Sequence, residues 1–253
     1  MIVDNNSPVT GAVQAMKQAF FACRNGVVAD ALRAAGDPHR YIMGCQLTDV
    51  ASIVSQFSHF SQFSHFSQHS QDSQDSQDSQ DSRISQDSRN SQLSQDSRNS
   101  QLSQLSRDFQ QSQPSQDSFF AHLSQALWTD RDHRECRMAA TMLYPPNEFS
   151  QETALEWARG VETSEIADVL CHRLLRKLPF ALELADQLLA DETPLVRYTA
   201  FRLLLNLLLM GKATPTVALR QRVEKELARG EALLRPLLAS LQEELADATR
   251  EMA

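Results

Sequence analysis

The sequence is poor in glycine. Only seven glycines occur among 253 residues, and none lies between Gly44 and Gly160. Phosphate-binding loops of the GxGxxG or Walker type need closely spaced glycines, because the backbone must approach the phosphate groups. The sequence therefore gives no support to the nucleotide-binding α/β folds that use such loops.

Cysteines and long apolar runs are also few. The four cysteines are Cys23, Cys45, Cys136 and Cys171. Their wide spacing and apolar surroundings predict reduced, mostly buried thiols in a cytosolic protein. The longest nearly apolar run, Leu203–Met210, is far shorter than the roughly 20 residues of a membrane span. Residues 1–8 lack the cationic and apolar regions of a secretory signal. We expect a cytoplasmic monomer without membrane contact.

Positive charge is in deficit. The chain has 24 Lys and Arg against 32 Asp and Glu, which gives a net charge of −8. Residues 55–118 hold eight Asp and four Arg, so the rest of the chain has 24 acidic and 20 basic residues, a net charge of −4. This balance excludes a protein that binds nucleic acid through an overall basic charge, but it leaves room for a local cationic face.

Residues 55–118 form a low-complexity tract. Ser occupies 21 of the 22 positions at every third residue, usually followed by Gln, and only Phe109 breaks the pattern. A period of three fits neither a strand nor an α-helix. Ser and Asp disfavour helix interiors, and few apolar residues are present to offset the entropy of ordering. The tract is predicted to be a disordered or weakly ordered segment between folded regions at 1–54 and 119–253.

The tract contains two kinds of candidate functional residue, the serines of its Ser-Gln pairs and three histidines. The tract has 14 Ser-Gln pairs, and this dipeptide is the substrate of some DNA-damage kinases. Phosphorylation of the tract therefore stays an open alternative. The histidines His59, His65 and His69 share no spacing with a carboxylate or thiol, so no metal site is expected.

The remaining 189 residues, 253 less the 64 of the tract, show helical patterns almost throughout. Before the tract, helices are predicted over 12–23, 27–35 and 49–54. After it they are predicted over 119–128, 132–143, 151–159, 165–178, 180–190, 194–210, 217–229 and 231–250. Ser150, Thr163 and Thr193 stand at N-cap positions, and Pro194 fits the first helical position after Thr193. We found no alternating strand pattern, so the predicted fold class is all-α.

A second repeat has a period of 30 residues. Three sets of apolar residues share this spacing: Cys136, Ile166 and Val196; Ala140, Leu170 and Ala200; and Tyr144, Leu174 and Leu204. In each helix these positions are four residues apart and form one buried face. Helical pairs at this period predict an α–α superhelix in which each unit covers its neighbour.

The expected inner helices carry cations. These are Arg131, Arg134, Arg137, Arg173, Arg176, Lys177, Arg197 and Arg202. Along a concave wall they would form a local cationic surface. The alternative is that they are ordinary solvated arginines on exposed turns.

Several segments resemble one family. Residues 24–36 and 41–44 resemble the N-terminal signature of AlkD-like DNA alkylation repair proteins. The segments 126–128, 134–145, 165–168 and 196–200 follow in that family's order. The resemblance covers about residues 9–54 and 119–212.

The resemblance implies a HEAT-like solenoid that holds duplex DNA on a concave cationic face. The sequence itself gives no sign of a metal or an organic cofactor. Active members of the family excise N3- or N7-alkylated purines, and a carboxylate stabilises the oxocarbenium-like transition state. Asp168 matches that carboxylate, and the framing arginine's position falls on Tyr198, next to Arg197. The DNA-binding candidates are therefore Arg134, Arg137, Arg173, Arg197 and Tyr198.

Two classes of function stay open. One is a DNA glycosylase with a degenerate active site, because Ser164 stands where an aromatic residue would frame the lesion. The other is a non-catalytic scaffold that binds DNA or a protein partner. Asp168 would then be a helix-surface carboxylate that pairs with Arg173 or His172. Trp128 and Trp157 are expected to belong to the core.

Overall fold

The fold is known from a computed structural model, which describes residues 8–58 and 115–251. Most of the Ser-Gln tract lies outside these residues. The prediction that this segment is disordered therefore concerns residues outside the described part of the chain. In the described part of the chain, no helix is long and apolar enough to cross a membrane.

The described chain is built from helices, as the sequence predicts. The helices are α1 (Pro8–Ala22), α2 (Gly26–Ala34), an unlabelled helix over residues 47–58, α5 (Gln116–Thr129), α6 (Arg134–Leu143), α7 (Gln151–Arg159), α8 (Ser164–Arg173), α9 (Ala181–Leu189), α10 (Pro194–Leu209), α11 (Val217–Arg229) and α12 (Arg235–Glu251). Two short 3-10 helices are η1 (Pro146–Glu148) and η2 (Leu175–Lys177). The predicted all-α class is confirmed, and α7 and α11 begin and end at the predicted residues.

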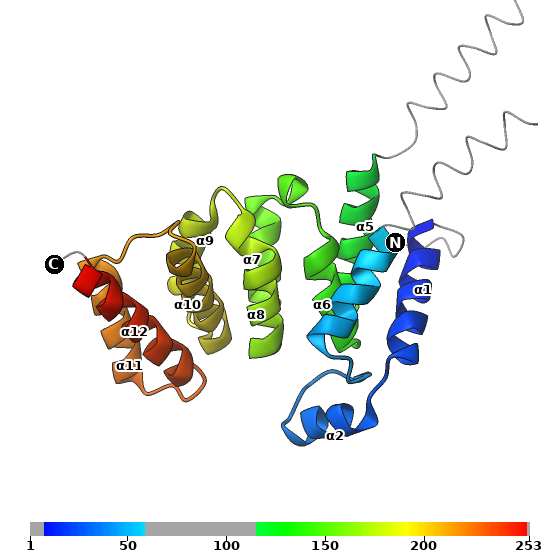
Figure 1. The fold of residues 1–253 in the computed structure, drawn as a ribbon, viewed down its shortest axis with the longest axis horizontal. Helices are drawn as coiled ribbons and strands as arrows, with labels where there is room; N and C mark the ends of the chain where they lie inside the picture. Colours follow the sequence, from blue (N-terminus) through cyan, green and yellow to red (C-terminus); the bar gives the residue numbers. More distant parts are fainter. Residues whose placement is uncertain (1–7, 59–114, 252–253) are drawn as a thin grey trace, which may run out of the picture.

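The helices stand side by side in two rows (Figure 1). In one row α6 packs against α8, α8 against α10, and α10 against α12. The second row includes α5, α7 and α9, with α5 packed on α6 and α9 on α10. This arrangement is an α-helical repeat superhelix, and it confirms the predicted stacking of helical pairs.

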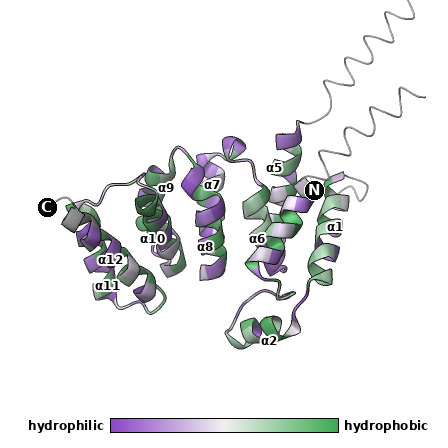
Figure 2. Ribbon diagram, in the orientation of Figure 1, coloured by the Kyte–Doolittle hydropathy of each residue, from purple (hydrophilic) through white to green (hydrophobic). Residues whose placement is uncertain are grey.

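The 30-residue period reappears in the helix starts. The helices α6, α8 and α10 begin at residues 134, 164 and 194, and α7 and α9 begin at 151 and 181. Of the nine apolar residues that define the repeat, all but Tyr144 are buried. Tyr144 is half-buried because it is the C-cap of α6, where the helix ends. The mostly apolar α10 (Figure 2) is covered by α8, α9 and α12.

Side-chain hydrogen bonds also connect successive repeats. Arg134 reaches Glu165, Gln125 accepts from Trp157, and Arg197 reaches Glu226, at separations of 31, 32 and 29 residues. A bond at about one repeat length joins a helical pair to the next pair along the superhelix. Neighbouring units are therefore held by polar contacts as well as by apolar burial.

The N-terminal helices dock on the same body. The backbone N–H of Tyr41 donates to the Asp132 carbonyl at 2.8 Å, and the Glu135 carboxylate accepts from the N–H of Gly44 at 2.9 Å. Gly44 has a φ of +75°, and a Cβ there would lie 2.2 Å from the Asn25 carbonyl oxygen, so only glycine fits. Residues 8–58 therefore pack on α5 and α6, although the tract separates them in sequence.

Both ends of the tract are helical. The helix over 47–58 continues past residue 54, and Phe57 packs against the core. On the other side, the Ser115 hydroxyl accepts from the N–H of Ser118 at 3.1 Å and caps α5. The expected segment boundaries at 55 and 118 thus fall inside two helices, because Phe57 and Ser115 make native contacts.

Both tryptophans and three of the four cysteines lie in the interior. The rings of Trp128 and Trp157 stack at 4.2 Å, and both are buried, as predicted. All four cysteines are unpaired thiols, and Cys45, Cys136 and Cys171 are buried, whereas Cys23 is exposed. Burial raises the pKa of the Cys45 and Cys136 thiols to about 12, so these two thiols are protonated and unreactive at neutral pH.

Candidate functional site

Asp168 lies on α8 and faces α10. The hydroxyl of Thr163 accepts from the N–H of Ile166 at 3.2 Å and fixes the start of α8. Ile166, Ala167, Val169 and Leu170 are buried, and these residues hold the helix against its neighbours. Asp168 stands among them on a side that is only partly covered, and 37% of its side chain is exposed.

Two residues of α10 hold the Asp168 carboxylate. The Tyr198 hydroxyl donates to Oδ1 at 2.9 Å, and Arg202 donates from Nε to Oδ1 at 2.6 Å and from Nη2 to Oδ2 at 3.0 Å. Tyr198 and Arg202 are four residues apart, so they lie on the same face of α10. The carboxylate therefore has a fixed orientation.

The Tyr198 hydroxyl donates to Asp168 and also accepts from Arg202 Nη2 at 3.4 Å. Burial and the nearby Asp168 charge raise the pKa of Tyr198 to about 12. Oδ1 of Asp168 accepts two hydrogen bonds and Oδ2 accepts one from Arg202. Because each carboxylate oxygen has two lone pairs, Oδ2 keeps capacity for one more interaction. A partly exposed, oriented carboxylate with spare capacity can stabilise a positive charge next to it.

Asp168 opens into a cleft of about 270 Å³. The cleft is lined by Leu47, Asp168, Val169, His172, Arg173, Arg202 and Asn206. Leu47 is the first residue of the helix over 47–58. The docked N-terminal region therefore contributes one wall, and α8 and α10 contribute the others.

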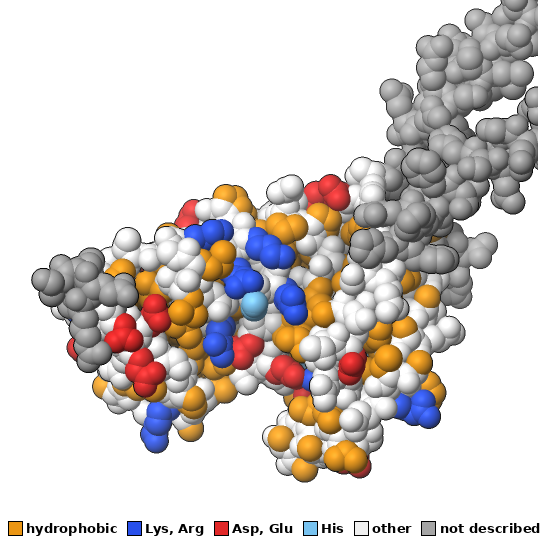
Figure 3. Space-filling view, in the orientation of Figure 1, with side chains coloured by type: hydrophobic (Ala, Val, Ile, Leu, Met, Phe, Trp, Pro, Cys, Tyr) orange, Lys and Arg blue, Asp and Glu red, His pale blue; other side chains and the backbone are white. Residues whose placement is uncertain are grey.

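Cations gather next to this cleft. We call Arg173, Arg176, Lys177, Lys212 and the adjacent His172 the cationic surface; each is exposed or half-buried. In Figure 3 a group of Lys and Arg side chains surrounds a histidine on the face over α8 and α10. Lys212 donates to the Arg176 carbonyl at 3.2 Å, which ties the end of α10 to η2. A local cationic face therefore exists despite the negative net charge.

Three of the predicted DNA-binding arginines lie in the interior. Arg134 is 2% exposed and pairs with Glu165 and Glu135. Arg197 is 4% exposed, and its Nε donates to Glu226 at 2.8 Å. Glu165 and Glu226 belong to neighbouring helices of the stack, so these guanidinium groups connect repeats and do not form a surface.

Arg137 is also buried, at 2% exposure. It donates to the carbonyls of Trp128 and Gly160, and its guanidinium carbon lies 3.7 Å from the centre of the Trp128 ring. Burial lowers the pKa of Arg137 to about 10, which leaves it charged at neutral pH. Of the predicted set, only Arg173 lies on the cationic surface, and Tyr198 faces Asp168.

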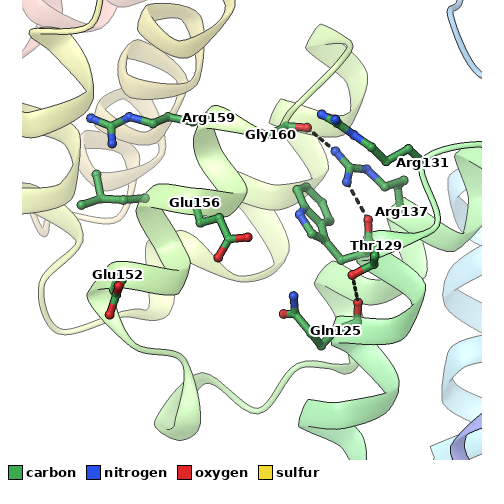
Figure 4. A pocket seen from close by; sticks show the side chains of 10 residues that line it. Gln125, Thr129, Arg131, Arg137, Glu152, Glu156, Arg159 and Gly160 are labelled. Atoms are coloured by element: carbon green, nitrogen blue, oxygen red, sulfur yellow. Dashed lines mark hydrogen bonds between the residues drawn. The ribbon is translucent and has the colours of Figure 1, made fainter. Parts of the chain in front are cut away.

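Arg137 forms part of a larger cleft, of about 670 Å³, between α5 and α7 (Figure 4). Several polar side chains of this cleft are bound to other groups of the protein. Gln125 accepts from Trp157 at 3.2 Å, and Thr129 donates to the Gln125 carbonyl at 2.8 Å. Arg159 pairs with Asp191 at 3.3 Å. We assign no chemistry to this cleft.

The residue that sequence reasoning missed is Arg202 as the partner of Asp168. The expected partners were Arg173 or His172, on the same helix. The repeat contains the signal, because Tyr198 is 30 residues after Asp168 and Arg202 is one turn further. Corresponding positions in adjacent stacked helices face each other, and this brings α10 residues to Asp168.

Within residues 8–58 and 115–251, His, Cys, Asp and Glu do not form a group of three or more that could hold a metal ion.

The fold and the site define a class: an α-helical repeat protein with an oriented carboxylate beside a cationic surface. The chain matches the family model described as DNA alkylation repair enzyme over residues 96–233, more than half of its length. It therefore belongs to the DNA alkylation repair enzyme family, as the resemblance predicts, and the match supports a role in DNA alkylation repair. No curated protein and no solved structure matches the chain.

Proposed function

We propose that the protein binds duplex DNA through its cationic surface and excises N3- or N7-alkylated purines, with Asp168 as the catalytic carboxylate. The observation that carries this proposal is the placement of Asp168, which is oriented by Arg202 and Tyr198 and 37% exposed beside the cations. Membership in the DNA alkylation repair enzyme family supports DNA as the ligand.

The cationic surface suits a phosphate backbone. Arg173, Arg176 and Lys177 lie close together at the end of α8 and in η2, and Lys212 lies beside them. Their mutual repulsion is one cause of the lowered pKa of Lys177, after burial. DNA phosphates would relieve this repulsion and release counterions, which makes binding favourable and dependent on salt.

The chemistry needs only charge stabilisation. An N3- or N7-alkylated purine carries a positive charge, so the base leaves as a neutral molecule when its glycosidic bond breaks and takes the bonding electron pair. The sugar then develops oxocarbenium character, which a fixed carboxylate stabilises. Water adds to the sugar carbon and loses a proton, and an abasic site remains. Asp168 would act through its charge, and its Oδ2 has capacity for this contact.

The test measures release of 7-methylguanine and 3-methyladenine from alkylated duplex DNA, with binding followed on the same samples. Wild-type protein should release base above the spontaneous background, and Asp168→Asn should lose at least about 100-fold of the rate, in the range found when one charge-stabilising group is removed. Because Asp168→Asn leaves Arg202 without a counter-charge, DNA affinity should stay equal or increase. A lower rate would then not reflect lost binding.

The control is Asp186→Asn, an exposed carboxylate on α9 that pairs with Arg222. It should release base at the wild-type rate. Absence of release above background at high protein concentration would overturn the glycosylase proposal. Equal release by wild type and Asp168→Asn would remove Asp168 from the mechanism.

A second candidate, a non-catalytic DNA-binding protein, is favoured by two observations. Arg202 already neutralises part of the Asp168 charge, and Tyr198 occupies one lone pair of its Oδ1. Ser164, at the start of α8, offers no aromatic ring to frame a lesion. In this case the protein binds duplex DNA without base release. The logarithm of affinity should still fall against the logarithm of salt concentration, with a slope of about −0.9 per phosphate contacted.

A further inference from the structure

We propose that His172 is a phosphate-binding residue of the cationic surface and that it takes up a proton when duplex DNA binds. This inference rests on the proposed function, because its ligand is the DNA backbone.

The position of His172 carries the inference. It is exposed in the last turn of α8, and its side chain lines the same cleft as Asp168 and Arg202. Among the described residues, neither ring nitrogen of His172 takes part in a hydrogen bond. An imidazole that is open to solvent and adjacent to Arg173 can therefore donate to a phosphate oxygen.

The charges around His172 are mostly positive. Arg173 comes from α8, Arg176 and Lys177 from η2, and Arg202 from α10. Asp168, one turn earlier on α8, is engaged by Arg202 and Tyr198. The other residues lining the cleft, Leu47, Val169 and Asn206, carry no charge. His172 is thus the one group in this cluster that titrates near neutral pH.

Burial and the four surrounding cations lower the pKa of His172 below its ordinary value of 6.5. In the protein without DNA, the ring is therefore mainly neutral at neutral pH. Phosphates of a bound duplex would place negative charge among the same cations and favour the protonated ring. The pKa in the complex should then be higher than the pKa in the protein alone.

The sign of the pH dependence follows from this difference. A group whose pKa rises on binding makes the complex tighter at low pH, and the gain is lost as the pH rises through the pKa of the complex. The affinity for DNA should change only between the pKa of His172 in the protein alone and its pKa in the complex. It should be constant at pH values above and below this interval.

The experiment measures the affinity for an undamaged duplex at constant ionic strength. For wild type it should increase about three- to tenfold from about pH 7.5 to about pH 5.5, because a rise of about half a unit to one unit in the pKa on binding changes the affinity by that factor. For His172→Gln the same change should be less than about twofold, because the amide does not titrate in this range.

The matched control is His122→Gln, an exposed histidine on α5, which should keep the wild-type pH dependence. The tract histidines are present in all three proteins and therefore cancel in the comparison. Calorimetry in two buffers of different ionisation enthalpy should show more protons taken up by wild type than by His172→Gln. Equal pH dependence and equal proton uptake in the two proteins would overturn the inference and leave the proposed function intact. Absence of duplex binding at every pH would overturn both.

Discussion

The arginines of this protein fall into two groups, which differ in what surrounds the guanidinium group. Arg134, Arg137 and Arg197 are buried and bound by carboxylates or carbonyls, whereas Arg173 and Arg176 are at least partly exposed beside other cations. A buried guanidinium satisfies several acceptors at once and positions the backbone that supplies them. The same residue type thus binds acceptors in the interior at three positions and carries solvent-accessible charge at two others.

Arg137 allows the structural role to be tested. Replacing it with Met removes the donors to the Trp128 and Gly160 carbonyls and the contact with the Trp128 ring. We expect Arg137→Met to lower the free energy of unfolding by about 2–4 kcal/mol, because buried carbonyls lose their partners. Urea unfolding followed by circular dichroism measures this change.

The control for that measurement is Arg131→Gln. Arg131 is 63% exposed and pairs with Glu162 at 2.9 Å. Loss of an exposed pair should cost less than about 1 kcal/mol. If Arg137→Met were as mild as Arg131→Gln, Arg137 would not be the structural residue described above.

At the scale of one element, α7 depends on its N-cap. The hydroxyl of Ser150 accepts from the N–H of Thr153 at 3.1 Å, and the helix begins at the next residue, Gln151. The C-terminal end of α7 leads to Gly160, whose carbonyl binds Arg137. By stabilising α7, the cap therefore helps to position the Gly160 carbonyl that accepts from Arg137.

Ser150→Ala should lower the free energy of unfolding by about 1 kcal/mol, because one N–H of the first turn loses its acceptor. Ser150→Asp should restore stability, since the carboxylate accepts the same hydrogen bond and interacts well with the helix N-terminus. Thermal unfolding of the three proteins measures the effect. A similar loss in both variants would indicate that packing around Ser150, and not the cap, sets the stability.

At the scale of the whole molecule, the folded body is assembled from both sides of the Ser-Gln tract. Hydrogen bonds join Tyr41 to Asp132 and Gly44 to Glu135, across 91 residues for the second pair. The residues that make these contacts lie outside 59–114. The cost of closing a loop grows only slowly with its length, by about 0.6 kcal/mol per doubling.

Replacing residues 59–114 with a Gly-Ser linker of about 15 residues should therefore leave the unfolding temperature unchanged or slightly higher, because the shorter loop costs less entropy. A deletion that also removes 55–58 and 115–118 should lower it, since Phe57 and the Ser115 cap are lost. Scanning calorimetry distinguishes the two. A large loss in the first variant would show that the tract contributes to the stability of the superhelix.

Much of the architecture could be read from the sequence, because it depends on local and periodic signals. The start of α7 follows from the Ser150 cap, and the start of α10 follows from the preference of proline for the first helical position. Thr193 stands at the N-cap of α10 as predicted, but its side chain makes no capping hydrogen bond. The period of 30 residues predicted which faces are buried, and burial of Cys136, Ile166 and Val196 confirms it. The helix predicted over residues 165–178 includes Asp168, which lies on α8 in the structure.

The sequence by itself thus determined the helices, their pairing and the repeat, because hydrophobic spacing and caps act along the chain. Only the tertiary structure decided which polar groups meet. Arg134 and Arg197 became interior residues because Glu165 and Glu226 approach them from other helices, and Asp168 gained Arg202 from the neighbouring helix. Whether a charge faces solvent or a partner depends on contacts between elements, and local sequence patterns do not specify those contacts.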